Sequence, residues 1–430
     1  MQYAQVEKPA RTTPRIILHG GAGNITRDNL PTMAYDEYRR ALLTILRSAN
    51  DELQRPNASA LDVATYAVSL LENNPLFNAG HGAVFTKAGK HELEASVMVS
   101  SGYRKRGVGV MKVSQAKSPI KLAREVLIRG ESDDGGGAQS HNQLAGETCD
   151  RLNREWGLES VKPSYFWTRS RWDEHRRGLN LPHDDRTYKE HRRLADKDAT
   201  DDVSECAHME AGATSDPSWN GKDYLPQGTV GAVVLDSSGV ICVATSTGGI
   251  TNKLPGRIGD TPTLGAGFWA EQWYERHQTT ASPATSWLQD CLPGLGSYIP
   301  LQNHTIQEKP RAVAMSGTGN GDSFLRINAV RTAAAIARYS HDPLSSSRHS
   351  LQTAITAVAG PHGQLQQSAG ERWGKTGEGE GGIIGIELRD GRGHVAYDHD
   401  CGGMFRAWID NDNNARFGVF QDEKTIEDQK

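Results

Sequence analysis

The 430-residue sequence predicts an α+β fold, and three observations support this prediction. Long stretches carry apolar residues at helical spacing, for example over about 34–55. Shorter runs are continuously apolar or alternate between apolar and polar residues, which is typical of strands. Two pairs of these runs are joined by short turns rich in glycine, serine and aspartate, which is typical of hairpins. A chain of this length can form one large domain or two.

The N-terminal part shows strand and helix signals in alternation. Residues 15–18 (RIIL) predict a short buried strand that ends in the glycine-rich turn 19–24 (HGGAGN). A helix is expected over about 34–55. A second helix should begin at the N-cap Ser59 and end near 73–75, where a proline disfavours continuation.

Three more elements follow before residue 131. HELEASVMVS (91–100) alternates like a strand, and GVGVMKV (107–113) predicts another. SPIKLAREVLIRG (118–130) predicts a helix, with serine and proline at its start. We therefore expect an ordered region over about 15–130.

Residues 131–228 are predicted to be a long, polar, mobile linker, because a glycine-rich break is followed by a segment dense in charge. Its histidines, His175, His183 and His191, fit no spacing typical of a metal site, so we interpret them as part of a solvated segment. The aromatic run SYFWTRSRW (164–172) is expected to dock part of the linker onto the body.

Ordered structure is predicted to resume at Thr229 with a hairpin. TVGAVVLD is followed by turn residues and by VICVATSTGG. If 236–239 form the turn, Leu235 pairs with Val240, and Thr229 falls opposite Ser246 with Thr247 beside it. The hairpin thus predicts a cluster of hydroxyl groups at one strand end.

The remaining sequence adds four predictions. AVAMSGTGNGD (312–322) reads as a strand followed by a glycine loop, and FLRINAVRTAAAIARY (324–339) reads as one helix. A second hairpin is expected within 381–400, turned at Asp390-Gly391. Residues 272–311 carry four prolines and little periodicity, and we interpret them as an insertion.

Composition excludes several classes of function. The formal net charge of -4 gives no electrostatic reason to expect nucleic acid or an anionic membrane as partner. The longest apolar runs are too short for a membrane span, and the N-terminus lacks the apolar core of a signal peptide. Five scattered cysteines argue for a reducing compartment and against a disulfide framework or a zinc site. We expect a cytoplasmic protein.

Thr229 raises a specific chemical hypothesis. A threonine hydroxyl needs a base to act as a nucleophile, and no GxSxG motif is present. A threonine at a chain's N-terminus carries its own base, because a free α-amine titrates at about 7.7–8.0. This arrangement requires cleavage between Gly228 and Thr229, where glycine adds little steric bulk. The alternative is an ordinary strand threonine, since threonine has a high β propensity.

A set of motifs along the chain points to a known family. In order, they are HGGAG, NPLFNAGHGAVF, HELEA, GTVGAVVLD, ATSTGGITNKLPGRIGDTPTLGAG, SGTGNGDSFLR and GGMFRAW. This ordered set resembles the plant-type L-asparaginase / isoaspartyl aminopeptidase family of N-terminal-nucleophile hydrolases. The resemblance covers about 15–130, 229–270 and 312–418.

The resemblance implies one globular domain with a four-layer αββα sandwich. It also implies a precursor that cuts itself into an α chain, residues 1–228, and a β chain, residues 229–430. The substrate would be a small β-aspartyl compound, either asparagine or an isoaspartyl dipeptide. The family's assembly implies a homodimer of αβ units.

Catalytic roles follow from the resemblance position by position. Thr229 matches the nucleophile, and Thr247 matches a second threonine that assists it. Thr318 and Gly319 match an oxyanion hole formed by a hydroxyl and a backbone N–H. Asn78 matches an asparagine beside the nucleophile.

Substrate binding is implied for a second group of positions. Arg257 matches an arginine that holds the α-carboxylate bidentately, and Asp260 matches its partner for the α-ammonium. Thr318, Gly319 and Gly321 complete the implied binding set. On spacing alone, Arg257 and Asp260 also fit a surface ion pair.

The resemblance implies no cofactor for catalysis but a structural sodium ion. Main-chain carbonyls suit a hard cation of this kind. The matching positions are Leu71, Glu72, Asn74, Phe77, Ala79 and His81.

The sequence departs from the family pattern at several positions. Asp322 ends the glycine loop where glutamate is usual, Glu94 stands where aspartate is common, and Cys401-Gly402 replaces a polar pair. The segments 131–228 and 272–311 are longer than in typical members. These departures leave the preference between asparagine and isoaspartyl dipeptides open. Two other functions also stay open: a threonine hydrolase acting on glycosylated asparagine or on proteins, and a non-cleaving relative that acts as a binding protein.

Overall fold

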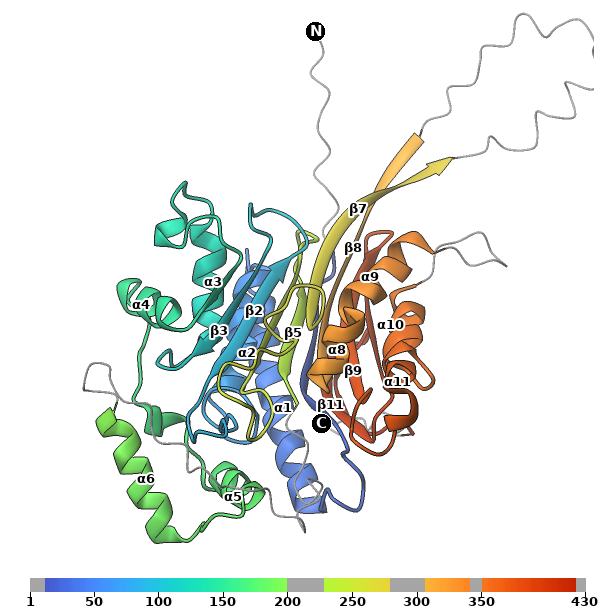
Figure 1. Cartoon of the computed structure of the whole chain (residues 1–430). Helices are drawn as coiled ribbons and strands as arrows, with labels where there is room; N and C mark the ends of the chain where they lie inside the picture. Colours follow the sequence, from blue (N-terminus) through green and yellow to red (C-terminus); the bar gives the residue numbers. More distant parts are fainter. Residues whose placement is uncertain (1–11, 199–227, 279–305, 341–349, 423–430) are drawn as a thin grey trace, which may run out of the picture.

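The computed structural model describes residues 12–198, 228–278, 306–340 and 350–422. These residues form helices and β-sheets, which confirms the α+β class (Figure 1). No helix in these ranges is long and apolar enough to span a bilayer. The sequence-based expectations for the N-terminal residues 1–11, for Cys206 and for Cys291 lie outside the described residues.

Two sheets run through the middle of the molecule. Within the described residues, the larger sheet has eight strands in the order β12-β11-β1-β5-β6-β2-β3-β4, and the smaller has four in the order β10-β9-β8-β7. Neighbouring strands are antiparallel except β3 and β4. The larger sheet comprises β1 (Arg15–Gly23), β2 (Leu93–Val99), β3 (Gly107–Val113), β4 (Gln143–Ala145), β5 (Val230–Leu235), β6 (Ile241–Thr247), β11 (Gly403–Ile409) and β12 (Ala415–Gly418). The smaller comprises β7 (Phe268–Gln278), β8 (Ile306–Gly319), β9 (Gly381–Arg389) and β10 (Arg392–His399).

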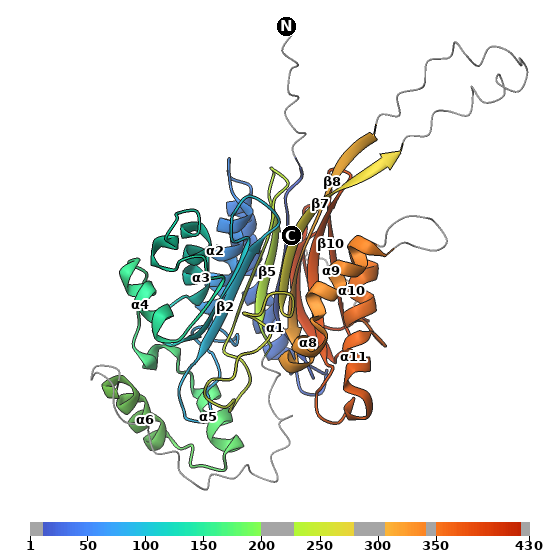
Figure 2. The same cartoon turned by 45° about the horizontal axis from the view of Figure 1, so that its top comes forward.

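Helices cover the outer face of each sheet (Figures 1 and 2). The larger sheet packs against α1 (Thr32–Leu53), α2 (Ala60–Glu72) and α3 (Pro119–Arg129). The smaller sheet packs against α9 (Ala329–Tyr339) and α10 (Leu351–Ala359), with α8 (Gly321–Ile327) and α11 (Gln364–Ala369) alongside. Separate apolar clusters fill the three spaces between these layers. Because one cluster lies between the two sheets, residues at their facing strand ends can converge on one site.

Several predicted elements have the expected local causes. The Ser59 side chain accepts the backbone N–H of Asp62 and caps α2, which ends before Asn73. The strands at 93–99 and 107–113, the helix beginning at Pro119 and the hairpin turned at Asp390-Gly391 are all confirmed. The chain therefore follows its local signals wherever the apolar pattern is strong.

The glycine-rich segment 19–23 is part of a strand, so its assignment to a turn was wrong. β1 continues to Gly23 and pairs with both β5 and β11. Gly21 and Gly23 have φ of 121° and 150°, which L side chains rarely adopt. A register shift between His19 and Gly21 accommodates the irregularity. The glycines thus bend the strand without ending it.

The prediction that residues 131–228 form a mobile linker was wrong for 131–198. This segment folds into α4 (Glu147–Glu155), α5 (Arg169–Gly178) and α6 (Asp185–Asp198). Phe85 packs with Trp167 and Trp172 in a separate buried cluster, so the expected docking of the aromatic run is confirmed. Burial of these large rings stabilises a segment whose average composition is polar. Residues 199–227 lie outside the described residues.

Two further details differ from the sequence prediction. Leu235 pairs with Ile241, one residue later than expected, because Asp236 accepts the N–H of Gly239 and donates its own N–H to Val240. Val230 therefore faces Ser246, and the register places Thr229 beside Thr247.

The helix expected over 324–339 is divided into α8 and α9 at Asn328, whose φ is 49°. Within the predicted insertion 272–311, β7 and β8 pair to their ends, and 279–305 lie outside the described residues.

The smaller sheet contains a buried charge network that we expect to be essential for stability. Arg311 is 2% exposed; its Nε lies 2.8 Å from Glu387 Oε1 and its Nη1 lies 2.9 Å from Glu275 Oε1. Arg311→Ala would leave these carboxylates buried without their cation. It should lower the free energy of unfolding by about 3–5 kcal/mol, measured by urea denaturation.

Lys309→Ala is the matched control, because Lys309 lies on the same strand and pairs with Asp390 in solvent. Lys309→Ala should lower the free energy of unfolding by less than about 1 kcal/mol. Equal effects of the two variants would contradict a buried role for Arg311.

Candidate active site

Thr229 lies immediately before β5, close to the facing end of β8. It is 6% exposed. Its hydroxyl oxygen is 2.8 Å from the hydroxyl oxygen of Thr261, and its backbone carbonyl accepts the hydroxyl of Thr318 at 3.0 Å. Thr261 lies between β6 and β7, and Thr318 is the penultimate residue of β8. The fold thus brings two other threonines into contact with the predicted nucleophile.

Gly228, on the other side of the predicted cleavage position, is packed against backbone. A Cβ at Gly228 would stand 2.4 Å from the amide nitrogen of Ala22 and 2.5 Å from Cα of Gly21. It would also stand 2.7 Å from the Thr318 hydroxyl oxygen. Only glycine fits this position without displacing the glycine-rich strand β1, so the peptide before Thr229 is held closely between β1 and β8.

Thr247 and Asn78 lie on the neighbouring strand end and loop. The Thr247 hydroxyl accepts the N–H of Gly249 at 3.0 Å. Asn78 is 2% exposed; its side-chain amide donates to the Gly249 carbonyl at 2.7 Å, and its own carbonyl accepts the N–H of Gly248 at 3.0 Å. Asn78 therefore holds the chain that leaves Thr247.

Gly319 follows Thr318 at the end of β8 with a φ of 144°. A Cβ there would lie 2.4 Å from the Glu380 carbonyl oxygen, so the position requires glycine. The chain then turns at Asn320, whose side chain accepts the N–H of Ser323 and caps α8. The backbone at Gly319 is thus closely held, and the oxyanion hole at Thr318 and Gly319 stays a prediction.

Arg257 and Asp260 come from the loop after β6 and meet Gly321. A Cβ at Gly321 would stand 2.5 Å from Asp260 Oδ1 and 3.0 Å from Arg257 Nη2. Asp260 is only 5% exposed, and its Oδ2 and the Nε of Arg257 have no hydrogen-bond partner among the described residues. Arg257 Nη2 lies 3.1 Å from Asp322 Oδ2. Asp260 is therefore buried rather than part of a surface ion pair, and its Oδ1 and the Nη2 of Arg257 lie together at Gly321.

The electrostatics of this loop favour a charged ligand. Burial raises the pKa of Asp260 to about 7, although nearby Arg257 opposes the shift. Beneath it, Glu94 is 1% exposed and accepts the N–H of Gly259 at 3.1 Å. The Lys253 ammonium lies 3.8 Å from Glu94 Oε1 and donates to the Glu92 carbonyl at 2.7 Å. An ammonium beside Asp260 would compensate the cost of its burial.

Sequence reasoning missed three residues near Thr229. Thr261 contacts its hydroxyl directly, and it lies in the quoted motif one residue after Asp260. His19 is fully buried, its Nε2 lies 2.6 Å from the Ser316 hydroxyl oxygen, and burial lowers its pKa to about 3. His19 is thus neutral, and it lies on β1 opposite Gly231. The only available signal was its place in the HGGAG motif.

The predicted sodium loop follows α2 and lies apart from the threonines in sequence. A Cβ at Gly82 would lie within 2.7 Å of the carbonyl oxygens of Pro75 and Phe77, and one at Gly80 would lie 2.5 Å from that of Glu72. The Glu72 carbonyl accepts the N–H of His81 at 2.7 Å. The sodium site stays a prediction.

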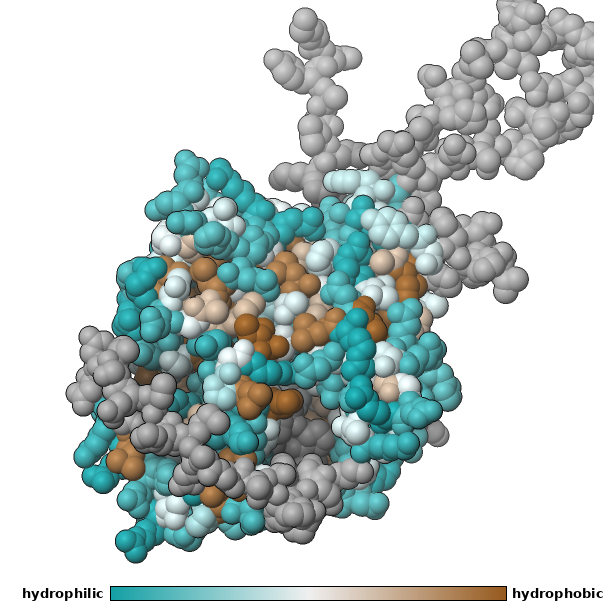
Figure 3. Space-filling view, in the orientation of Figure 1, coloured by the Kyte–Doolittle hydropathy of each residue, from teal (hydrophilic) through white to brown (hydrophobic). Residues whose placement is uncertain are grey.

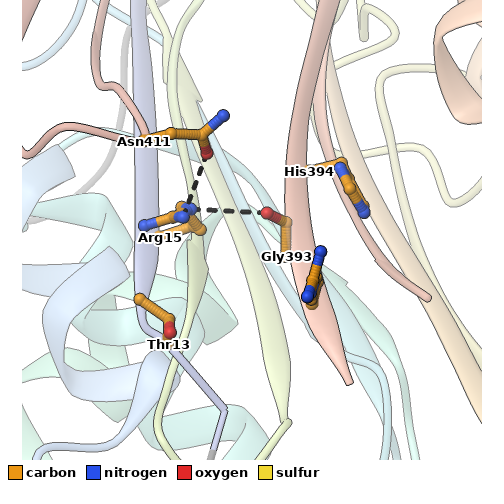
Figure 4. A pocket seen from close by; sticks show the side chains of 6 residues that line it. Thr13, Arg15, Gly393, His394 and Asn411 are labelled. Atoms are coloured by element: carbon orange, nitrogen blue, oxygen red, sulfur yellow. Dashed lines mark hydrogen bonds between the residues drawn. The ribbon is translucent and has the colours of Figure 1, made fainter. Parts of the chain in front are cut away.

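A separate pocket lies at the opposite end of the sheets. It is lined by Thr13, Arg15, Arg392, Gly393, His394 and Asn411, and Arg15 reaches across it to the Gly393 carbonyl and to Asn411 (Figure 4). Arg15 pairs with Leu235, at the far end of β5 from Thr229. Along a strand this is a separation of about 20 Å. The pocket is thus distinct from the candidate active site.

Comparison with known proteins identifies the family. A family model described as asparaginase matches residues 12–280. The chain belongs to the asparaginase family. Members of this family are hydrolases, which fits a buried threonine beside a charged ligand site. The match spans Thr229, Thr247, Arg257 and Asp260 in a single alignment to the asparaginase model.

Individual relatives agree with the family assignment. The isoaspartyl peptidase of Salmonella typhimurium strain LT2 is 31% identical over 95% of this chain and 98% of its own length. The isoaspartyl peptidase of Escherichia coli K12 is 30% identical over 95% of this chain and 96% of its own length. The plant-type L-asparaginase of Pyrococcus furiosus is 34% identical over 60% of this chain and 70% of its own. The similarity thus includes both halves of this asparaginase-family chain.

Proposed function

We propose that this protein is a threonine hydrolase that cleaves L-asparagine and β-aspartyl dipeptides after cutting its own chain between Gly228 and Thr229. The observation that carries the proposal is the buried Asp260: its Oδ1 and the Nη2 of Arg257 both lie at Gly321, and the next residue, Thr261, contacts Thr229. A carboxylate and a guanidinium side by side match the α-ammonium and α-carboxylate of an amino acid. The names of the relatives, isoaspartyl peptidase and L-asparaginase, support the same substrates.

The proposed self-cleavage uses the Thr229 hydroxyl. Its oxygen attacks the carbonyl carbon of Gly228, the C–N bond breaks, and the hydroxyl proton passes to the Thr229 nitrogen, so that this N-to-O acyl shift leaves an ester. Water hydrolyses the ester, which gives Gly228 a carboxylate and Thr229 a free amine. The close packing of Gly228 against Gly21 and Ala22 supports this step, because it restricts the scissile peptide to one geometry.

Substrate hydrolysis then uses the same hydroxyl. The free amine of Thr229 takes the proton of the Thr229 hydroxyl, and the hydroxyl oxygen bonds to the side-chain carbonyl carbon of the substrate. The Thr318 hydroxyl, which can rotate its hydrogen, and the Gly319 N–H stabilise the oxyanion. The C–N bond breaks, the leaving nitrogen takes the proton, and water hydrolyses the β-aspartyl ester. The products are aspartate and either ammonia or an amino acid.

The remaining expectations are part of the same proposal. The helix–sheet–sheet–helix order supports the four-layer αββα sandwich of N-terminal-nucleophile hydrolases. The resemblance to the family also leads us to propose a structural sodium ion held by the main chain of Leu71, Glu72, Asn74, Phe77, Ala79 and His81, in the loop where the Pro75 and Phe77 carbonyl oxygens approach Gly82. We further propose a cytoplasmic homodimer of αβ units.

The test is hydrolysis of four compounds by the purified, incubated protein, measured as release of glutamate from glutamine and of aspartate from the other three. Asparagine and a β-aspartyl dipeptide should be hydrolysed, whereas glutamine and the α-aspartyl isomer of the same dipeptide should not. The α-isomer is the matched control, because it differs only in which carboxyl group forms the amide. Hydrolysis of glycosylated asparagine alone would favour a glycosylasparaginase-like enzyme. Absence of hydrolysis with tight aspartate binding would favour a non-cleaving binding protein.

The pKa of Asp260 predicts how the affinity for substrate depends on pH. With a pKa of about 7, Asp260 loses its charge as the pH falls, and the neutral acid no longer attracts the substrate ammonium. KM for asparagine should therefore rise below pH 7, by about tenfold per pH unit at the acid limit. The bound ammonium keeps Asp260 ionised, so a fall in kcat below pH 7 would report protonation of the free Thr229 amine and not of Asp260.

KM and kcat measured from pH 5.5 to 8.5 check this prediction. Succinamate, which lacks the α-amine, is the control, and its KM should lack the rise. A flat KM for asparagine across this range would contradict the assigned role of Asp260.

A further inference from the structure

Helix α5 contacts the loop that carries Arg257 and Asp260. We call residues 248–260 the clamp loop, and the side chains Arg171, Trp172, Glu174 and His175 the α5 brace. All four brace side chains are buried, although the sequence around them is strongly charged. The helix lies at the lower end of the molecule in Figures 1 and 2, beside the larger sheet. Such burial shows that the helix packs against the body instead of extending into solvent.

The first attachment joins His175 to Asn252 at the tip of the clamp loop. His175 Nδ1 lies 2.5 Å from Asn252 Oδ1, and the Asn252 side-chain amide donates to the His175 carbonyl at 3.1 Å. Because the amide nitrogen must donate to that carbonyl, Oδ1 faces the ring, and Nδ1 carries the hydrogen. Burial lowers the pKa of His175 to about 4, so the ring is neutral at neutral pH.

Asn252 occupies a conformation that needs such support. Its φ is 58°, in the left-handed region that non-glycine residues seldom adopt. Its backbone N–H donates to the Phe85 carbonyl at 2.8 Å, and the Phe85 ring stacks on His175 with centroids 5.1 Å apart. The clamp loop also has exposed apolar side chains: Ile250 is 44% exposed and Leu254 is 64% exposed. Polar contacts at Asn252 therefore replace the apolar packing that these side chains lack.

The second attachment runs through Arg171, four residues before His175 and on the same face of α5. Arg171 Nε donates to the Gly82 carbonyl at 2.9 Å, and Nη2 donates to the Leu76 carbonyl at 3.3 Å. Glu174 pairs with Arg171 at 3.0 Å in the interior. The loop held in this way contains Asn78, which binds Gly248 and Gly249 at the start of the clamp loop.

We propose that His175 is a positioning residue that sets the conformation of the clamp loop through Asn252 and thereby the affinity for substrate. His175 precedes the Gly228–Thr229 bond and Asn252 follows it, so the contact joins the two pieces after cleavage. The segment that composition describes as a linker is thus a support for the binding site. The kinetic part of this inference rests on the proposed function, and the structural part does not.

Hydrogen–deuterium exchange of peptides within 248–260 tests the structural part. His175→Ala should speed exchange of this loop at least about threefold. Asn252→Gly tolerates the left-handed φ and removes the same hydrogen bonds, so it should speed exchange of the loop to a similar extent. The double variant should exchange only slightly faster than either single variant. His175→Asn keeps a donor near the position of Nδ1 and should restore part of the protection. His183→Ala is the matched control, because His183 lies in the same segment and bonds locally to Leu181.

Kinetics with asparagine test the functional part. His175→Ala should raise KM about three- to tenfold with kcat within about twofold, because it loosens binding and leaves Thr229 in place. Unchanged exchange in His175→Ala, or a wild-type KM in an active His175→Ala, overturns the inference while the proposed function stands. If the wild-type protein hydrolyses neither substrate, the proposed function fails, and the exchange result alone decides the support role.

Discussion

Replacing Thr229 by alanine is expected to leave the chain in one piece and to abolish hydrolysis of asparagine and β-aspartyl dipeptides. The variant lacks the hydroxyl that attacks both Gly228 and the substrate, and the two described hydroxyls that contact Thr229 belong to Thr261 and Thr318, which have no free α-amine. The loss in kcat should be on the order of 10⁴-fold or more. Denaturing gels and an aspartate-release assay on the same preparation measure both effects.

Two companion variants separate the causes. Thr229→Ser keeps the hydroxyl and the future amine, so it should still cut itself and keep measurable activity. Gly228→Ala keeps the hydroxyl but places a Cβ 2.4–2.5 Å from the backbone of Ala22 and Gly21, so it should slow cleavage strongly. Retained cleavage in Thr229→Ala would show that another residue or a contaminating protease cuts the chain.

Replacing Arg257 by alanine is expected to remove most substrate binding while self-cleavage continues. Arg257 lies beside Asp260 and Gly321, and its side chain forms an ion pair with Asp322. Losing a charge-assisted pair to the α-carboxylate costs about 2–5 kcal/mol, which is a fall in kcat/KM of about 30-fold or more. Arg257→Lys should recover only part of this, because an ammonium cannot bind bidentately.

Arg326→Ala provides the control for this experiment. Arg326 lies on the neighbouring helix α8 and pairs with Glu378 at the surface, away from the clamp loop. The kcat/KM of Arg326→Ala should stay within about twofold of the wild-type value. Wild-type kinetics in Arg257→Ala for both substrates would mean that the carboxylate is held elsewhere.

The sequence allowed most helices and strands to be predicted, because their apolar patterns are strong and their ends carry clear signals. Ser59 and Pro119 marked helix starts that the structure confirms. The register of the β5–β6 hairpin was one residue out, because the turn closes through Asp236 and Val240 in a way that composition does not specify. The break at Asn328 was missed because the helical periodicity continues through it.

The folded segment 131–198 could not be predicted from its polarity. Its stability depends on a few aromatic residues, Trp167 and Trp172 in particular, that pack on Phe85 from a distant part of the chain. Local periodicity does not report such long-range contacts. The average charge of the segment concealed a buried face, and with it the contact of His175 with the clamp loop.

The candidate site was predictable where a motif names it and not where only packing creates it. Thr229, Arg257 and Asp260 lie in quoted motifs, and the structure brings them close to Thr318 and Gly321. The hydroxyl contact of Thr261 depends on how the loop after β6 folds back. Likewise, the buried His19–Ser316 pair depends on two sheets facing each other.

The central claim is that Thr229 becomes a free N-terminus through its own chemistry. Intact mass spectrometry of purified wild-type protein, incubated at neutral pH without added protease, tests this most directly. We expect two polypeptides, residues 1–228 and 229–430, with threonine at the new N-terminus. A single uncut chain of 430 residues that still hydrolyses asparagine would contradict it.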